Sequence, residues 1–326
     1  MPVRLKARDQ MIRQAISRLF RWAGIAAASA LTAWFVWRLV LADWSSLPAE
    51  LPPILLVAAP ALALVYACLG LLLAFAWSWL AGAFTGEDHG QVRLHATTQV
   101  MKYLPGNVFH LAGRHGFAKR QGASHRALVL AALAEAGLLV FSAGIVAMLA
   151  LPYLSGLIAL PPAIWMTAGA CMLTGLALVL AWQRDRVGGI LRKLKSARQP
   201  LMGAGLAYLV FFAASGLIGY VLFALIAGDN ASGYLAATMG AMALAWLAGF
   251  LTPGAPAGLG VRESVLLIIL APGAGEASIL ALAALFRIVT VLGDGLLALG
   301  AAAFVKPAVG NGDRLHGRAS GLGTPS

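Results

Sequence analysis

The sequence predicts an all-α fold: a polytopic membrane helical bundle of about seven to eight spans with two broken-helix, re-entrant segments. Three observations lead to this fold class. Apolar residues make up 60% of the 326 residues and charged residues only 11%, whereas soluble domains carry about 25% charged residues. The mean hydropathy is +0.84. Long apolar runs recur without alternation, which favours helices over barrel strands.

Seven apolar runs are long enough for the roughly 20 residues that cross a bilayer. These runs are Phe20 to Leu41, Pro53 to Phe84, Ala127 to Leu151, Ala163 to Trp182, Leu201 to Gly228, Tyr234 to Leu251, and Ala277 to Val305. A further run, Ser264 to Ala271, is too short to cross alone. Residues 20–305 therefore form one predicted transmembrane domain, between a basic N-terminus (1–19) and a Gly/Ser/Pro-rich tail (306–326) that we expect to be disordered.

The basic residues sort by loop. Of the 24 Lys and Arg residues, 18 lie before or at the start of the first run, between the second and third, or between the fourth and fifth. The alternate loops carry Asp43, Glu50 and Asp229 without Lys or Arg. This asymmetry predicts a cytoplasmic N-terminus. The basic excess fits orientation and anionic lipid headgroups rather than nucleic acid, because no folded soluble domain remains to bind it.

Two segments, about 95–122 and 251–276, combine helix-breaking residues with charge. Each contains a Pro-Gly pair and an arginine nine residues after that proline, Arg114 in the first and Arg262 in the second. Irregular backbone at membrane depth must be buried in protein or line a polar cavity. The spacing predicts two related broken-helix hairpins that meet in the membrane. The alternative is a coincidence between two interfacial loops.

Arg114 and Arg262 are candidate ligands for a phosphate, because a guanidinium grips phosphate bidentately and stays charged. Backbone N–H groups of residues 256–260 could form an anion-binding nest, and a helix starting near Gly260 would add its positive end. The alternative is that both arginines extend to headgroups at the membrane surface.

Three ionisable residues lie inside predicted spans: Glu135, Arg287 and Asp294. Each costs about 2.5–3.5 kcal/mol to insert, so each needs a partner. We expect Glu135 to pair with Arg287, which shares a helix face with Asp294. Asp294 would neutralise a second basic group or carry a coupling proton, and Glu263 would pair with Arg262 or a backbone donor. A purely structural network is the alternative.

Tyr103, Asn107 and His110, with Lys102 beside them, surround the first break at spacings that share one helical face. They could hydrogen-bond a sugar or phosphate headgroup, although Tyr103 also suits an interfacial aromatic belt. No zinc motif, phosphate loop or Ser/His/Asp set is found, so we expect no metal, no cofactor and no catalytic activity. The two cysteines, Cys68 and Cys171, are interpreted as small core residues.

Three motifs follow one another along the chain: KYLPGNVFHLAGR (102–114), TPGAPAGLGVRE (252–263) and Phe-Arg (286–287). Over roughly residues 20–305 the chain resembles the lysylphosphatidylglycerol synthase transmembrane-region family of flippase-like membrane proteins. The resemblance implies functional positions at Pro105, Gly106, Arg114, Pro256, Gly258, Gly260, Glu263 and Arg287. The chain departs from many members at Leu111-Ala112-Gly113, where they carry Gly-Gly-Asp. No segment resembles the aminoacyl-transferring soluble domain of the two-part synthase.

The resemblance implies a bacterial inner-membrane protein that translocates lipids or assists lipid-modifying enzymes. We therefore expect a lipid translocase that binds an anionic phospholipid, a polyprenyl-phosphate-linked sugar or another glycolipid in an intramembrane groove. A second interpretation is a non-catalytic membrane subunit that docks a glycosyltransferase or lipid-modifying enzyme through residues 183–200. An enzyme acting on a lipid headgroup would need a reactive pair that the sequence does not reveal.

Overall fold

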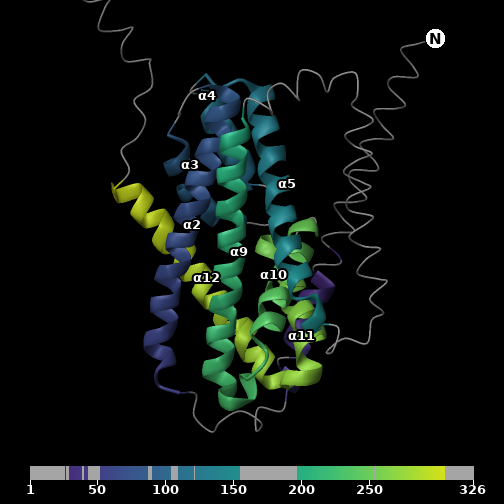
Figure 1. Cartoon of the computed structure of the whole chain (residues 1–326). Helices are drawn as coiled ribbons and strands as arrows, with labels where there is room; N and C mark the ends of the chain where they lie inside the picture. The colour runs from purple at the N-terminus through teal and green to yellow at the C-terminus, as the bar shows by residue number, and fades with distance from the viewer. Residues whose placement is uncertain are drawn as a thin grey trace, which may run out of the picture.

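A computed structural model describes residues 26, 29–38, 40–42, 52–86, 90–103, 109–120, 122–154, 197–252 and 255–304. The elements in these ranges are all helices (Figure 1). In chain order they are α2 (Leu55–Thr85), α3 (Gln91–Thr98), η2 (Gln99–Tyr103), α4 (Phe109–Arg120), α5 (His125–Leu149), α6 (Leu151–Leu154), α9 (Arg198–Ala227), η3 (Gly228–Ala231), α10 (Leu235–Leu251), η4 (Pro256–Gly258), α11 (Val261–Ala274) and α12 (Glu276–Phe304). The elements named η are 3₁₀ turns. Residues 29–38 are also helical.

Five helical segments are long and apolar enough to cross a membrane: α2, α5, α9 with η3, η4 with α11, and α12. Helix α10 is apolar but has only 17 residues. The chain is therefore a multi-pass membrane protein by helix length and hydropathy. The helices α2, α5, α9 and α12 lie within a few residues of predicted runs. The predicted run 163–182 lies outside the described residues, as do the basic N-terminus (1–19) and residues 306–326.

The run Ser264 to Ala271, too short to cross alone, is part of a longer helical segment. That run is the middle of α11, and η4 with α11 spans Pro256–Ala274, 19 residues with a mean hydropathy of 1.5. Pro272 lies inside the helix near its end. Arg262 and Glu263 precede the apolar run in the sequence, and the helix includes both: Glu263 accepts from Arg287, and Arg262 lines a pocket within the bundle.

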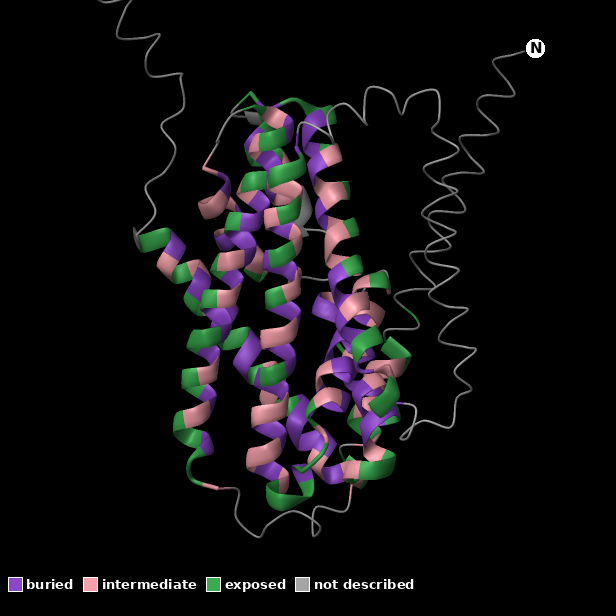
Figure 2. Cartoon of the chain, in the orientation of Figure 1, coloured by how far each residue is buried: buried purple, intermediate pink, exposed green. Residues whose placement is uncertain are grey.

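Helix α2 packs against α12, α9, α3 and α5, and α10 packs against α5, α9 and α11. Buried side chains line the contacts between these helices, and exposed side chains lie on their outer sides (Figure 2). Small residues allow close approach. The Cβ of an alanine at Gly240 of α10 would lie 2.3 Å from the Cβ of Ala150. Cys68 is exposed on α2, so the expectation that it is a core residue was wrong.

The two broken segments meet, as the sequence predicted. Helix α3 continues into the 3₁₀ turn η2, which packs against η4 and α12. The chain reverses direction through Ala257, Gly258 and Gly260, all with positive φ (49°, 73° and 78°). Such φ values disfavour side chains with a Cβ. Gly260 packs tightly on the first helix, because a Cβ there would lie 2.4 Å from the backbone N of Thr32.

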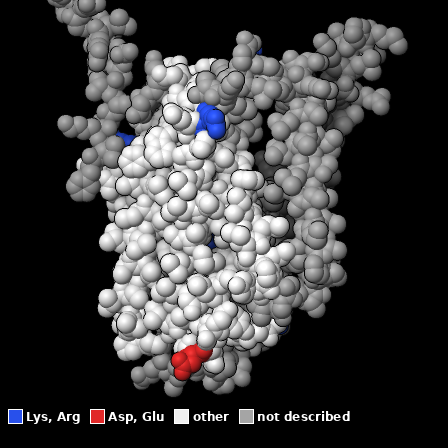
Figure 3. Space-filling model, in the orientation of Figure 1, with Lys and Arg blue, Asp and Glu red and all other residues white. Residues whose placement is uncertain are grey.

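On the surface, charged side chains lie mainly toward the ends of the molecule. On the face in Figure 3, uncharged side chains cover nearly all of the middle, with basic side chains toward one end and an acidic one at the other. Lys119, Arg126 and Arg198 lie at or beside the junctions that begin α5 and α9, and Asp229 lies in η3 at the opposite end of α9. An uncharged middle is what hydrocarbon requires.

Candidate functional site: a cationic pocket beside three ion pairs

Four cations and three carboxylates of the two broken segments and the adjoining spans lie inside the bundle. Three of the cations, Arg114, Arg287 and Lys102, each pair with one carboxylate. Arg262, the fourth, lines a pocket and has no carboxylate partner among the described residues.

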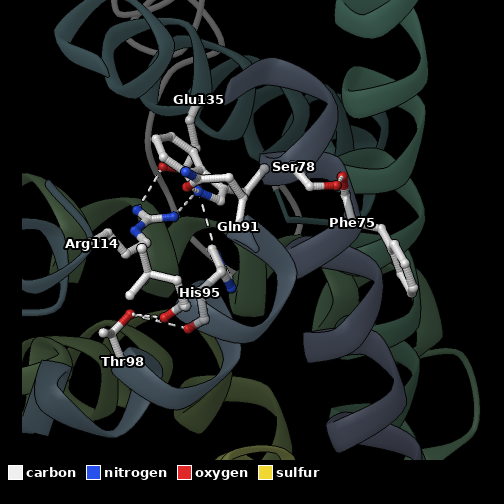
Figure 4. A network of polar contacts seen from close by, with 9 residues as sticks. Phe75, Ser78, Gln91, His95, Thr98, Arg114 and Glu135 are labelled. Atoms are coloured by element: carbon white, nitrogen blue, oxygen red, sulfur yellow. Dashed lines mark hydrogen bonds and ion pairs between the residues drawn. The ribbon is translucent and has the colours of Figure 1, made fainter. Parts of the chain in front are cut away.

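Arg114 of α4 pairs with Glu135 of α5. Its Nη1 donates to Glu135 Oε1 at 2.9 Å and its Nη2 to Oε2 at 2.7 Å, a bidentate arrangement (Figure 4). Both side chains are buried, at 4% and 5% exposure. The guanidinium also lies over the ring of Trp77, 4.2 Å from its centroid. A bidentate pair of this kind leaves little of the guanidinium for a ligand, so Arg114 joins α4 to α5 and α2.

His95 of α3 completes this cluster. Its Nε2 lies 3.6 Å from Glu135 Oε1, and the side chain is buried. Burial and the nearby Arg114 guanidinium lower the pKa of His95 to about 4. The imidazole is thus neutral at physiological pH, and Arg114 and Glu135 remain a pair without net charge. Next to it, Trp77 Nε1 donates to Gln91 Oε1 at 2.9 Å.

Asp294 of α12 binds the first broken segment. Lys102 Nζ lies 2.8 Å from Asp294 Oδ2, and the Tyr103 hydroxyl donates to the same oxygen at 2.6 Å. The prediction that Asp294 neutralises a second basic group is therefore confirmed, and the group is Lys102. This contact joins η2 to α12 across 191 residues of sequence.

Arg287 of α12 binds the second broken segment. Its Nε donates to Glu263 Oε1 at 3.0 Å, its Nη2 donates to the same oxygen, and its Nη1 donates to the carbonyl of Ala257 at 3.2 Å. Arg287 thereby holds the positive-φ turn against α12. The predicted pairs Glu135–Arg287 and Glu263–Arg262 were both wrong. Glu135 pairs with Arg114 of α4, and Glu263 accepts from Arg287.

Arg262 and Glu263 open onto a pocket bounded by α2, α9, α10, α11 and α12. It has a volume of about 580 Å³, counting the space at its open side, and its lining includes Tyr66, Phe211, Ser215, Trp246, Arg262, Glu263, Phe286, Arg287 and Thr290. The Arg262 guanidinium lies 6.0 Å from the centroid of the Trp246 ring. Aromatic side chains from α2, α9, α10 and α12 thus line the pocket together with the charged groups of α11 and α12.

Glycines on two sides fix the Arg262 side chain. A Cβ at Gly249 of α10 would lie 2.9 Å from Arg262 Nε, and one at Gly258 would lie 2.6 Å from the same atom. The side chain therefore passes through a slot whose walls are the backbone of α10 and η4. In this arrangement, only glycine at positions 249 and 258 leaves room for the Arg262 side chain.

Three polar atoms of the pocket lining are buried and have no hydrogen-bond partner in the described part of the chain: Arg262 Nε, Glu263 Oε2 and Ser215 Oγ. Buried polar atoms are nearly always hydrogen-bonded in folded proteins. Leaving one unpaired costs about 1–3 kcal/mol. All three belong to residues that line the same pocket.

The remaining predicted residues fall in different places. Pro105, Gly106 and Asn107 lie outside the described residues, and His110 lies in α4, where only its backbone is described. Pro256 begins η4. A helix does begin beside Gly260, which precedes Val261 of α11. The N–H groups of Gly258 and Leu259 are used within the turn, donating to Ala255 and Pro256 carbonyls.

Sequence reasoning missed the aromatic and hydroxyl part of the pocket. Tyr66, Ser215 and Trp246 each lie inside a long apolar run, and nothing in those runs distinguishes a pocket-lining position from a packed one. The small residues Gly216 and Gly219, which follow Ser215, were a usable signal. They mark the face of α9 that approaches α10.

The fold and the pocket define a multi-pass helical membrane protein with a buried cationic site. No family model matches the chain, and no match to it was found among curated proteins.

Proposed function

We propose that the chain is a flippase-like lipid translocase that binds the phosphate-bearing headgroup of a lipid or glycolipid in the Arg262 pocket. The observation that carries this proposal is Arg262 itself, a cation among buried groups without a carboxylate partner in the described structure. A charge held at membrane depth is costly. An anionic headgroup in the pocket would neutralise the charge of the Arg262 guanidinium.

The lining of the pocket supports a lipid ligand. Phe211, Trp246 and Phe286 give it an apolar wall, while Arg262, Arg287 and Ser215 give it donors. A headgroup that carries its own glycerol or sugar needs both kinds of surface. The acyl chains would remain in the bilayer beside the helices. The likeness of residues 252–263 to the flippase-like family supports the same class of ligand.

The three ion pairs suit a protein that moves a headgroup through the bilayer. Lys102–Asp294 and Arg287–Glu263 both join a broken segment to α12. Arg287, Thr290 and Asp294 are spaced three, four and seven residues apart, so they share one face of that helix. A translocating headgroup could exchange partners along this face.

We further propose a bacterial inner membrane location with the N-terminus in the cytoplasm.

Native mass spectrometry of gently purified protein tests the proposal. We expect wild-type protein to retain a phosphorylated lipid and Arg262→Gln to lose it, because Gln keeps a donor but removes the charge. Arg126→Gln is the matched control, since it removes one exposed arginine from α5 outside the pocket. Thermal unfolding must show that all three proteins are folded.

The retained lipid, once identified by mass, is then the substrate for translocation assays in proteoliposomes. Equal retention of bulk lipid by all three proteins would contradict the proposal. Co-purification of one stable enzyme would then favour the subunit interpretation. The docking segment considered for that role, residues 183–200, lies largely outside the described residues.

A further inference from the structure

The pocket and the ion pair beside it carry a net charge that limits the ligands they can hold. Arg262, Glu263 and Arg287 line the pocket. Asp294 lies one turn beyond Thr290, another lining residue, and holds Lys102. Tyr66 lies between the two groups: it lines the pocket, and Gly293 packs against its side chain. These five charged side chains belong to one polar region.

Within this region three cations face two carboxylates, which leaves a net charge of +1. The nearby Arg114–Glu135 pair adds none, and His95 is neutral. Coulomb interactions are screened far less in a buried site than in water. The most favourable ligand is therefore one that brings the total charge to zero. A ligand with two negative charges would leave an uncompensated charge at membrane depth.

We infer that the pocket selects a singly charged phosphodiester and discriminates against a doubly charged phosphomonoester. This inference rests on the proposed function and specifies its substrate class. A phosphodiester keeps a single charge across the physiological pH range. A phosphomonoester carries a second charge above its second pKa of about 6. The same pocket should therefore treat the two phosphates differently at pH 8 and alike at pH 5.

Two lipids that differ by one methyl group test this difference. Dioctanoyl phosphatidylmethanol is a monoanionic diester, and dioctanoyl phosphatidic acid is the matching monoester. Both are added in equal amounts to delipidated wild-type protein in detergent, and bound lipid is counted by native mass spectrometry. We expect about a tenfold or greater preference for phosphatidylmethanol at pH 8, equivalent to about 1.4 kcal/mol. At pH 5 the preference should largely disappear.

A charge variant provides an independent test. Asp294→Asn releases Lys102 and raises the net charge of the region to +2, while the amide oxygen can still accept the Tyr103 hydroxyl. This variant should gain phosphatidic acid binding at pH 8 relative to phosphatidylmethanol. Should the variant not fold, the wild-type comparison between pH 8 and pH 5 decides the inference alone.

The outcomes separate this inference from the proposed function. Equal binding of both lipids at pH 8, with both lost in Arg262→Gln, would overturn the charge selection and leave the phosphate pocket intact. Binding of neither lipid above dioctanoyl phosphatidylcholine, unaffected by Arg262→Gln, would overturn both. Dimethyl phosphate, a soluble diester, shows whether the pocket recognises the diester of a lipid headgroup or a free diester anion. Displacement of the lipid by an equal concentration of it would show that the pocket takes a soluble anion instead.

Discussion

At the scale of single residues, the arginines divide into two kinds. Arg114 and Arg287 are each bound to a carboxylate, whereas Arg262 lies near the Trp246 ring and has no carboxylate partner among the described residues. Burying an ion pair seldom stabilises a protein much, but removing one partner leaves the other charge buried without a counter-charge. The bound arginines therefore serve the fold, and Arg262 is the arginine whose presence the fold does not explain.

The Arg114–Glu135 pair makes a direct prediction. Arg114→Gln should lower the free energy of unfolding by about 3–5 kcal/mol, because Glu135 is then buried without its cation. The double variant Arg114→Gln/Glu135→Gln should recover much of that loss, since two amides can hydrogen-bond without charge. Thermal unfolding in detergent measures both. A double variant no more stable than the single one would show that the two side chains are not coupled.

At the scale of helices, close packing depends on where glycines face a neighbour. On α9, an alanine Cβ at Gly216 would lie 2.9 Å from the Cα of Met239 on α10, whereas one at Gly219 would meet the flexible side chain of Met242. Backbone cannot move aside as a side chain can. The α9–α10 contact, which also bounds the pocket through Ser215 and Trp246, is thus fixed mainly at Gly216.

We accordingly expect Gly216→Ala to destabilise the protein by about 1–3 kcal/mol. Gly300→Ala on α12 is the matched control, because its Cβ would meet nothing within 4 Å. It should be neutral or stabilising by up to about 1 kcal/mol. Unfolding midpoints of the two variants in the same detergent check this. Equal effects would mean that α9 and α10 are not in close contact at Gly216.

The sequence was a good guide to the helices and a poorer guide to their partners. The run Ala277 to Val305 matches α12 within one residue at each end, because hydrophobic length alone defines a span. The pairing of Glu135 depended on the rotation of α5 and on which helix lay beside it. Neither property can be inferred from the sequence alone, so Arg287 was an equally reasonable partner for Glu135. The structure places Arg114 beside Glu135 instead.

The same limit applied to the pocket. Arg262 could be selected from the sequence because a charge in an apolar segment is conspicuous. Ser215 and Trp246 could not, since their role depends on three helices converging around them. The meeting of the two broken segments was predictable from their matched spacing, whereas the contacts of η2 with α12 through Lys102 and Tyr103 were not.

At the scale of the whole molecule, the distribution of charge predicts an orientation. Lys119, Arg126 and Arg198 lie near one end of the bundle and Asp229 near the other. Basic connections remain in the cytoplasm. The connection between α4 and α5 should therefore be cytoplasmic, and the connection between η3 and α10 should face the opposite side.

Cysteine labelling tests this orientation. Ser124 and Ser232 are exposed residues of the two connections, and each can be replaced by Cys in a Cys68→Ser/Cys171→Ser background. In intact cells a membrane-impermeant maleimide should label Ser232→Cys and not Ser124→Cys, and inside-out vesicles should give the reverse. Labelling of both positions from the same side would contradict the topology.

The slot between Gly249 and Gly258 has a consequence for affinity. A free arginine samples many rotamers, and immobilising such a side chain on binding costs about 0.5–1.5 kcal/mol. In this protein the backbone of α10 and η4 already confines the Arg262 stem before any anion arrives. Much of the loss of rotamer entropy is thus incurred during folding rather than during binding. Under the proposed function, two residues that carry no charge and donate nothing to a ligand would thereby influence how tightly an anion is held.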